Sequence, residues 1–249
     1  MRPARSGFVL RVADDLDAVP EAQSAAAQSS HTVLMIAPNA FESNAQAACD
    51  NAFMAKTAAD ARDSVRAAVL AEHAALYAAL TSAGVRVRLF AGKDGAPDAV
   101  FPNNWYSLSR GALTLYPMKC PNRSAERRPE LVAWLRELPG ARRFLDLTGA
   151  EHASPPAALE GTGSLVFDHI LGVAYATRSE RCDTALAQRA ADFLGFQELH
   201  VFDAMDAQGR PVCAFPSPPY GLLCWFVADS HRRPHQRGHE RGLRFRNRV

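Results

Sequence analysis

The sequence predicts an α/β fold built from a repeated module in which two strands are followed by a helix and a third strand. Short apolar or alternating runs are typical of strands, and longer stretches carry apolar residues at helical spacing. The same order of elements returns after about sixty residues, as expected for a modular architecture. No linker-like segment separates the copies, so the sequence indicates one domain.

The first module is incomplete. Val33–Ile36 is an apolar run closed by Pro38, which predicts a buried strand. Helical spacing from Ala58 to Ala83 predicts a helix, which Gly84 ends at the position of a left-handed cap. Val85–Phe90 alternates between apolar and basic residues and predicts a half-buried strand.

The second module begins at Asp98–Ser107, which we expect to be a strand that ends at Pro102, since proline cannot donate to a ladder. Leu113–Met118 follows a Ser-Arg-Gly turn, which predicts a hairpin between the two strands. A helix over Arg123–Leu138 and a strand over Arg142–Leu147 complete the module.

The third module repeats this order. Ser164–His169 and Val173–Ala176 flank a glycine and predict two paired strands. The next helix is expected from Ser179 to Leu194, ending at Gly195, and Leu199–Phe202 closes the module as a strand.

Composition excludes several classes of protein. With 249 residues and 48% apolar residues, the chain can bury a sizeable core. Its five cysteines are odd in number and form no Cys-x-x-Cys pair, which indicates a reduced, cytoplasmic protein without structural zinc or another metal site. No apolar run approaches the length of about 20 residues that spans a membrane. Residues 1–30 lack the apolar core of a secretory signal and are expected to be a poorly ordered leader.

The C-terminal tail differs from the rest of the chain. Residues 231–249 hold seven arginines and one glutamate. Such a charge makes salt-dependent contacts with phosphates, so nucleic-acid binding is an alternative function. No base-reading module accompanies the tail, which does not favour that alternative.

Two stretches carry residues suited to ligand binding. Asn103 and Asn104 follow a proline and precede two aromatic residues. The alternative to ligand binding is a turn whose side-chain amides form hydrogen bonds with nearby backbone groups. Glu160 precedes a Gly-x-Gly turn, which holds its carboxylate on a compact backbone. A phosphate loop would need a helix after the glycines, and a strand is expected there instead. A tight turn with no ligand remains the alternative.

These stretches, taken together and in order, resemble the guanidine-modifying superfamily. That superfamily includes the arginine deiminases, the dimethylarginine dimethylaminohydrolases and the amidinotransferases, and the bacterial citrulline-utilisation hydrolases are the branch most similar to this sequence. The resemblance covers about residues 32–212. It rests on Met35-x-x-Pro38-x-x-Phe41-x-x-Asn44, Asp98-Ala-Val-Phe-Pro-Asn-Asn-Trp-Tyr-Ser107, Leu159-Glu-Gly-Thr-Gly-Ser-Leu-Val166 and Ala174-Tyr-Ala176.

The resemblance implies a pentein fold, an α/β propeller of five strand-strand-helix-strand modules, of which this chain holds about three. We therefore expect a leader at 1–30, an incomplete propeller domain at 31–212 and a non-family tail at 213–249. The implied chemistry is hydrolysis of a guanidino or ureido C–N bond without metal or organic cofactor. A cysteine thiolate attacks the central carbon, and water activated by a histidine hydrolyses the adduct.

The resemblance also implies the site residues. Glu160 matches the catalytic glutamate that holds the planar nitrogens of the substrate, and Asn104 stands where arginine deiminases carry an aspartate. An amide donates to a ureido oxygen as well as accepting from nitrogen, so a small amino acid such as citrulline is favoured over arginine. The residues expected to bind this substrate are Asp98, Phe101, Asn103, Asn104, Gly161 and Gly163.

The sequence departs from the family pattern after Val212. The His-x-Asn motif and the late nucleophilic cysteine are missing, and Cys213 and Cys224 lack the family's surroundings. We interpret the change in composition as a frameshift or truncation of a longer gene. The chain is then expected to be inactive, and the alternative function is that of a non-catalytic remnant that at most binds a small amino acid.

Overall fold

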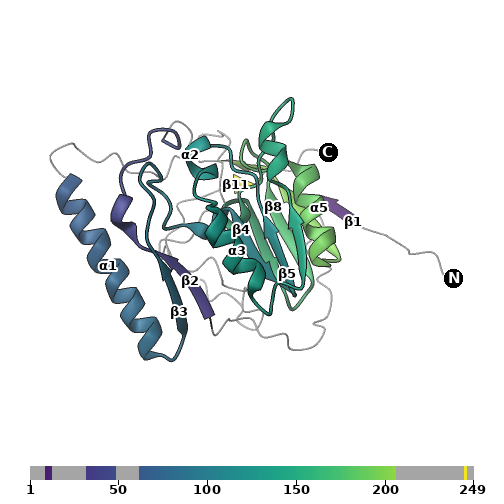
Figure 1. Cartoon of the computed structure of the whole chain (residues 1–249). Coiled ribbons are helices and arrows are strands. Elements are labelled where there is room, and N and C mark those ends of the chain that lie inside the picture. Colours follow the sequence, from purple (N-terminus) through teal and green to yellow (C-terminus); the bar gives the residue numbers. More distant parts are fainter. Residues whose placement is uncertain (1–8, 13–31, 49–61, 206–243, 246–249) are drawn as a thin grey trace, which may run out of the picture. The chain divides into compact units, whose positions relative to one another are not determined.

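The structure is a computed structural model, and it describes residues 9–12, 32–48, 62–205 and 244–245 (Figure 1). The chain divides into two compact units, which are treated separately below. The first unit is Ser29–Glu151, and the second combines Met1–Gln28 with His152–Val249.

The first unit opens with a two-stranded parallel sheet. Strands β2 (Thr32–Ile36) and β3 (Arg86–Phe90) pair in register and are joined by helix α1 (Arg62–Ser82). Gly84 follows the helix with φ of 80°, the left-handed conformation that favours glycine. This is the incomplete first module, with one strand fewer than the modules that follow.

A complete module makes up the rest of the first unit. Strand β4 is antiparallel to β5 across a turn at Arg110 and Gly111, and β5 is parallel to β6. Its elements are β4 (Tyr106–Ser109), β5 (Ala112–Leu115), α2 (Pro121–Ser124), α3 (Pro129–Glu137) and β6 (Arg143–Asp146).

The core of the first unit joins its two sheets. Leu131 and Leu135 of α3 are buried and pack in one cluster with Trp105, which is fully buried in front of β4. Ile36 of β2 belongs to the same cluster, as do Ala96, Ala99, Leu113, Leu115 and Met118. This packing fixes the segment that leads from β3 into β4, where the predicted site residues of this unit lie.

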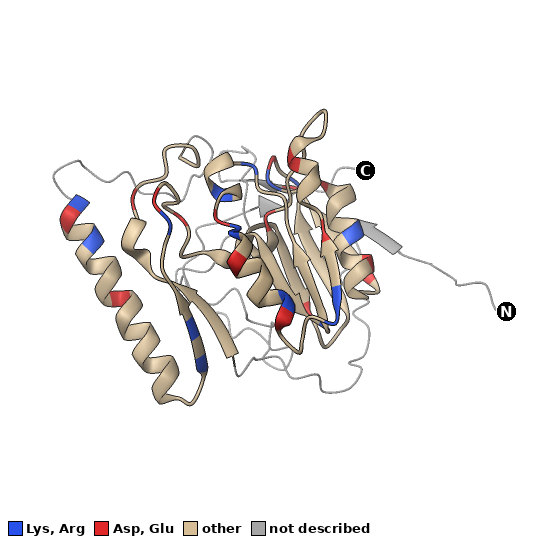
Figure 2. Ribbon diagram, in the orientation of Figure 1, with Lys and Arg blue, Asp and Glu red and all other residues tan. Residues whose placement is uncertain are grey.

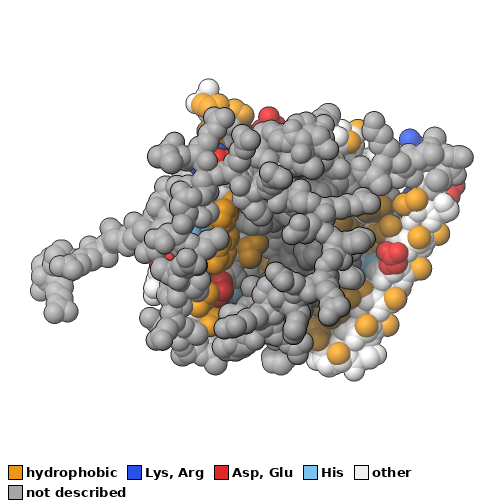
Figure 3. All heavy atoms as spheres, turned by 180° about the vertical axis from the view of Figure 1, so that it is seen from behind, with side chains coloured by type: hydrophobic (Ala, Val, Ile, Leu, Met, Phe, Trp, Pro, Cys, Tyr) orange, Lys and Arg blue, Asp and Glu red, His pale blue; other side chains and the backbone are white. Residues whose placement is uncertain are grey.

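Helix α1 lies on this unit with none of its residues buried. Its contact stripe, Val65, Val69, His73, Leu76 and Leu80, is half-buried, at the spacing expected for one helix face. The charged residues lie in its first half (Figure 2). Hydrophobic side chains are scattered over its outer face in the rear view (Figure 3), and Leu70 and Tyr77 are among the exposed ones.

The second unit repeats the complete module. Strand β7 is antiparallel to β8, β8 is parallel to β9, and β1 adds a parallel strand beyond β9. Helix α5 buries Leu186, Ala187, Ala190, Ala191 and Leu194. The elements are β1 (Val9–Val12), α4 (Gly161–Ser164), β7 (Leu165–Asp168), β8 (Val173–Thr177), α5 (Thr184–Leu194), β9 (Glu198–Phe202), β10 (Ala204–Met205) and β11 (Arg244–Phe245).

The predicted α/β fold of strand-strand-helix-strand modules is confirmed, with two complete copies and one incomplete copy. The predicted hairpin and the helix end at Gly195, whose φ is 75°, are also confirmed. Of the predicted leader, residues 9–12 form β1, and of the predicted tail, residues 244–245 form β11. The remainder of those two segments lies outside the described residues, as do Cys213, Cys224 and residues 58–61 of the predicted helix.

The prediction of a strand that ends at Pro102 is wrong. Asp98–Phe101 is a turn, Pro102–Asn104 is a 3-10 helix, and β4 starts only at Tyr106. The reason is local: the Phe101 N–H donates to the Asp98 carbonyl at 2.9 Å and the Asn104 N–H to the Phe101 carbonyl at 3.2 Å. These hydrogen bonds pair backbone N–H and C=O groups within the segment, so these groups do not require a neighbouring strand. The two amides therefore precede a strand.

Two helix boundaries also differ from prediction. The expected helix over residues 123–138 is two helices: α2 ends at Ser124, and Pro129 starts α3, with Arg128 before it extended, the conformation favoured before a proline. Helix α5 starts at Thr184, later than the expected Ser179, because the Asp183 side chain accepts a hydrogen bond from the Leu186 N–H at 2.9 Å and caps the helix there. The glycines after Glu160 form the single helical turn α4 before the expected strand.

Candidate functional site

In the first unit, Asn104 lies against Arg123. Asn104 ends the 3-10 helix before β4, and Arg123 comes from α2, which follows β5. Arg123 Nη2 donates to Asn104 Oδ1 at 3.2 Å and to the Phe101 carbonyl at 3.1 Å. Within the described part of the chain, Asn104 Nδ2 has no hydrogen-bond partner. The amide therefore presents its N–H donors outward and keeps its oxygen toward Arg123.

Arg123 is itself held by Glu126. Arg123 Nε donates to Glu126 Oε1 at 2.7 Å, and Nη2 donates to Oε2 at 3.2 Å. Both residues are buried, 6% and 3% exposed. A two-point contact between a planar guanidinium and a carboxylate restricts both side chains to one relative orientation.

Asp98 joins the same cluster through Asn44. Asn44 Nδ2 donates to Asp98 Oδ2 at 2.6 Å, and Arg123 Nη1 lies 4.0 Å from that oxygen. Asn122 Nδ2 donates in turn to Asn44 Oδ1 at 2.8 Å. Oδ1 of Asp98 has no hydrogen-bond partner among the residues that the structure describes, and its role in binding a ligand stays a prediction.

Of the two other predicted residues of this unit, Phe101 caps the 3-10 helix Pro102–Asn104 and Asn103 lies within it. Phe101 contributes its carbonyl to Arg123, while its side chain is 44% exposed. Asn103 is half-buried next to Asn104. The structure thus brings Asp98, Asn104 and the Phe101 backbone to one arginine, and the role of the Asn103 side chain stays a prediction.

In the second unit, Glu160 is paired with Arg181. Arg181 Nη1 lies 3.1 Å from Oε1 and 2.9 Å from Oε2 of Glu160, and the two residues are 8% and 3% exposed. The backbones are joined as well, because the Glu160 N–H donates to the Arg181 carbonyl at 3.0 Å. The predicted catalytic carboxylate is therefore buried with its charge balanced.

The two predicted glycines shape the turn that carries Glu160. Gly161 has φ of 29°, a conformation that residues with a side chain rarely adopt. The Gly163 N–H donates to the Glu160 carbonyl at 2.7 Å and closes the single turn of α4. This turn lies directly before β7, and it holds the Glu160 side chain against Arg181.

The two clusters follow one pattern, which the sequence reasoning missed. In each complete module an acid or amide precedes the first strand, and an arginine follows the second strand. The separations are similar, 19 residues from Asn104 to Arg123 and 21 from Glu160 to Arg181. Aligning the two modules by their strands would have revealed both arginines, because they occupy equivalent places in the repeat.

The described cysteines are not suited to nucleophilic attack. Cys120 and Cys182 are both buried. Burial, with a smaller effect of the Asp183 charge, raises the pKa of the Cys182 thiol to about 12. At neutral pH this thiol is protonated and is a weak nucleophile. Cys49 lies outside the described residues, with Cys213 and Cys224.

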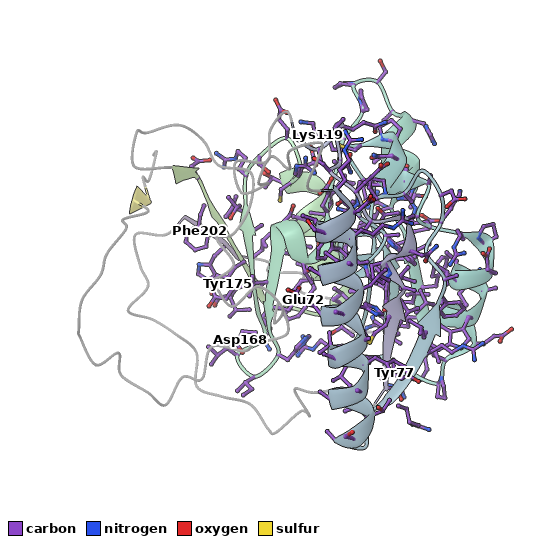
Figure 4. The ribbon with its side chains drawn as sticks, turned by 90° about the vertical axis from the view of Figure 1, so that its left-hand side faces the viewer. Glu72, Tyr77, Lys119, Asp168, Tyr175 and Phe202 are labelled. Carbon is purple, nitrogen blue, oxygen red and sulfur yellow. The ribbon has the colours of Figure 1, made fainter. Side chains whose placement is uncertain are left out.

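A histidine lies on the sheet of the second unit, away from helix α5. His200 Nε2 lies 3.1 Å from Glu198 Oε2, and its ring stacks on Tyr175, which stacks on Phe202. Figure 4 shows Tyr175 and Phe202 on the same side of the strands that carry them. No cluster of three metal-ligating side chains occurs in residues 9–12, 32–48, 62–205 and 244–245. No helix in these ranges is long and apolar enough to cross a membrane.

Solved structures with the same fold include an arginine dihydrolase, ArgZ, and the protein AgrE. The N-terminal domain of ArgZ, an arginine dihydrolase from the ornithine-ammonia cycle in cyanobacteria, solved as its C264S mutant with substrate, matches with a TM-score of 0.56 and 18% identity. The match covers 72% of this chain and 60% of that domain. Unliganded AgrE matches with a TM-score of 0.56 and 18% identity, over 72% of this chain and 24% of AgrE. No match was found among curated proteins.

The match to a family model, together with the repeated modules of the fold, places the protein in the guanidine-modifying superfamily of pentein-fold proteins. Within it, residues 37–214 match the family described as N,N dimethylarginine dimethylhydrolase, eukaryotic, and the chain belongs to that family. This is a hydrolase family related to arginine metabolism.

Proposed function

We propose that the chain binds a small amino acid that carries a ureido group, with citrulline favoured over arginine. The orientation of the Asn104 amide carries this proposal. Its oxygen accepts from Arg123 at 3.2 Å, so its N–H donors are the part that a ligand meets. A guanidinium offers only donors, whereas a ureido group offers a carbonyl acceptor. Asn104 in this orientation therefore complements the neutral ureido group.

Asp98 supports the same class of ligand. Its buried carboxylate keeps Oδ1 without a partner among the described residues, which suits the ammonium group of an amino acid. A charge-assisted hydrogen bond of this kind is about twice as strong as a neutral one. In this proposal Phe101 and Asn103 frame the turn between Asp98 and Asn104, and Gly161 and Gly163 shape the turn that carries Glu160.

In the second unit, Glu160 has the role that the family resemblance implies, which is to accept hydrogen bonds from planar nitrogens of a substrate. Arg181 orients the Glu160 side chain, since it contacts both carboxylate oxygens. In the complete chemistry a cysteine thiolate attacks the central carbon and water hydrolyses the adduct. No metal or organic cofactor enters this scheme.

We further propose that this chain binds its amino acid without hydrolysing it. The observation that favours this second function is the state of the described cysteines, both buried and one with a pKa of about 12. The missing His-x-Asn motif after Val212 supports the same view. Residues 31–212 are then the family domain and 213–249 a tail, and the cysteine usage supports a cytoplasmic location.

Titration calorimetry of the full chain with citrulline, arginine and ornithine tests both proposals. We expect citrulline to bind more tightly than arginine, and an ammonia assay with the same samples to show no turnover. Tighter binding of arginine would refute the ureido preference. Release of ammonia from citrulline would confirm the hydrolase chemistry and refute the non-catalytic function.

A further inference from the structure

We propose that Glu126 is a positioning residue that sets the preference for a ureido over a guanidino group. It acts through Arg123, which fixes the orientation of the Asn104 amide. This inference rests on the proposed function, because it explains the selectivity of the same site. It assigns a role to a side chain that is 3% exposed and that contacts Arg123.

The first step is the immobilisation of Arg123. Glu126 accepts from Nε at 2.7 Å and from Nη2 at 3.2 Å, so it occupies one edge of the planar guanidinium. Nη2 carries a second hydrogen, which points away from that edge. Asn104 Oδ1 at 3.2 Å and the Phe101 carbonyl at 3.1 Å are its acceptors. Glu126 thus determines where this second hydrogen points.

The second step is the effect on the amide. A flip of the Asn104 side chain exchanges oxygen and nitrogen with almost no change in shape. With Arg123 held, the flipped amide would turn its own N–H groups toward the Nη2 donor and lose the hydrogen bond. No other side-chain partner of Asn104 occurs among the described residues, so Arg123 decides between the two orientations.

The third step is selectivity. When Glu126 no longer holds Arg123, Asn104 samples both orientations, and the flipped one presents its oxygen to the ligand. A guanidinium can then donate a hydrogen bond to that oxygen, whereas a ureido carbonyl no longer accepts hydrogen bonds from the Asn104 N–H groups. The affinity ratio of citrulline to arginine therefore falls when Glu126 is replaced. Loss of a negative charge on its own would weaken arginine binding and raise the ratio, so a fall distinguishes positioning from simple electrostatics.

The test compares the wild-type chain with Glu126→Gln by titration calorimetry with citrulline and arginine. Glutamine keeps the size of the side chain but offers one acceptor in place of two. We expect the citrulline-to-arginine affinity ratio to fall about fivefold, the effect of one hydrogen bond. An unchanged or raised ratio overturns the inference.

Glu151→Gln is the matched control. Glu151 is paired with Arg127 at 2.7 Å, and both side chains are largely buried in the same unit, without contact to Asn104. Its replacement removes the same charge from a similar ion pair, and we expect the affinity ratio to stay at the wild-type value. A fall in Glu151→Gln equal to that in Glu126→Gln overturns the assignment to Glu126.

A double substitution covers the case in which Glu126→Gln does not fold. Arg123→Met with Glu126→Met replaces a buried ion pair by apolar side chains of similar length, which proteins commonly tolerate. Asn104 then loses its orienting donor, and the affinity ratio falls as before. A ratio equal to that of the wild type in the double variant overturns the inference.

A ligand-free measurement separates this inference from the proposed function. The Asn104 side-chain amide signals in an NMR spectrum, identified by their loss in Asn104→Asp, report its hydrogen bonding. If the wild type binds neither amino acid, the proposed function fails. The positioning role then stands if Glu126→Gln shifts or broadens these signals and Glu151→Gln does not. It is overturned if neither variant changes them.

Discussion

Arg181 holds both carboxylate oxygens of Glu160 through a single nitrogen, Nη1, at 3.1 and 2.9 Å. Both side chains are buried, so this contact stabilises both charges away from water. The contact joins the turn before β7 to the segment after β8, and it positions the carboxylate for which the family resemblance implies a catalytic role.

Replacing one member of this pair should destabilise the second unit more than replacing both. Arg181→Met removes the cation that contacts both oxygens of the buried Glu160 carboxylate, and we expect a loss of about 3–5 kcal/mol in the free energy of unfolding. The double variant, with Glu160→Gln added, also removes the carboxylate charge and should recover most of the loss. Urea unfolding followed by circular dichroism measures both. Equal losses in the single and double variants would show that the charge is not the cause.

Asn104→Asp should reverse the ligand preference. A carboxylate accepts from the N–H groups of a guanidinium and has no donor for a ureido oxygen. Hydrogen bonds to charged groups contribute about 1.5–3 kcal/mol, so arginine should gain affinity relative to citrulline by at least about tenfold. Calorimetry with both amino acids measures the change. Asn103→Asp, which places the same charge one residue away, is the control and should change the ratio less.

Stability should fall at alkaline pH in part because of Cys182. Burial raises its pKa from 9.0 to about 12, so the folded chain keeps the proton that the unfolded chain releases. The protonated thiol contributes stability that is fully present below pH 9 and is lost as the pH rises toward 12. Urea midpoints measured under reducing conditions should therefore drop less between pH 8 and pH 10.5 in Cys182→Ala than in the wild type. Parallel declines would contradict this prediction.

Asp183→Ala should remove the cap of helix α5. The Asp183 carboxylate accepts from the Leu186 N–H at 2.9 Å, and alanine leaves that donor without its partner. The expected loss is about 1 kcal/mol in the free energy of unfolding. Asp183→Asn, which keeps a capping oxygen, should retain most of the stability. If asparagine destabilises as much as alanine, the charge of Asp183 matters more than the hydrogen bond.

The fold could be predicted to the extent that local pattern specifies it. Strands such as β3 and helices such as α1 show their periodicity directly, and Gly84 and Gly195 mark helix ends by their left-handed conformation. Asp98–Phe101 is predicted as a strand because it holds three consecutive apolar residues, but only Ala99 of these is buried and Phe101 is 44% exposed, as a turn places them.

Of each contact in the candidate site, only one of the two residues could be predicted from the sequence. Asn104 and Glu160 stand in recognisable motifs, whereas Arg123 and Arg181 stand in segments without a motif of their own. Their partners lie 19 and 21 residues away, a separation that becomes a contact only when the paired strands between them form.

The repeated α/β module, the family resemblance, and the presence of an amide at position 104 and a carboxylate at position 160 follow from the amino-acid sequence alone. Side-chain chemistry and local periodicity are properties of the amino-acid sequence, so they can be recognised before the fold is known. The hydrogen bonds from Arg123 to the Asn104 oxygen and from Arg181 to both Glu160 oxygens become visible only in the folded structure. The direction in which an amide or a carboxylate faces depends on the donors that packing brings to it, and those donors come from elsewhere in the chain.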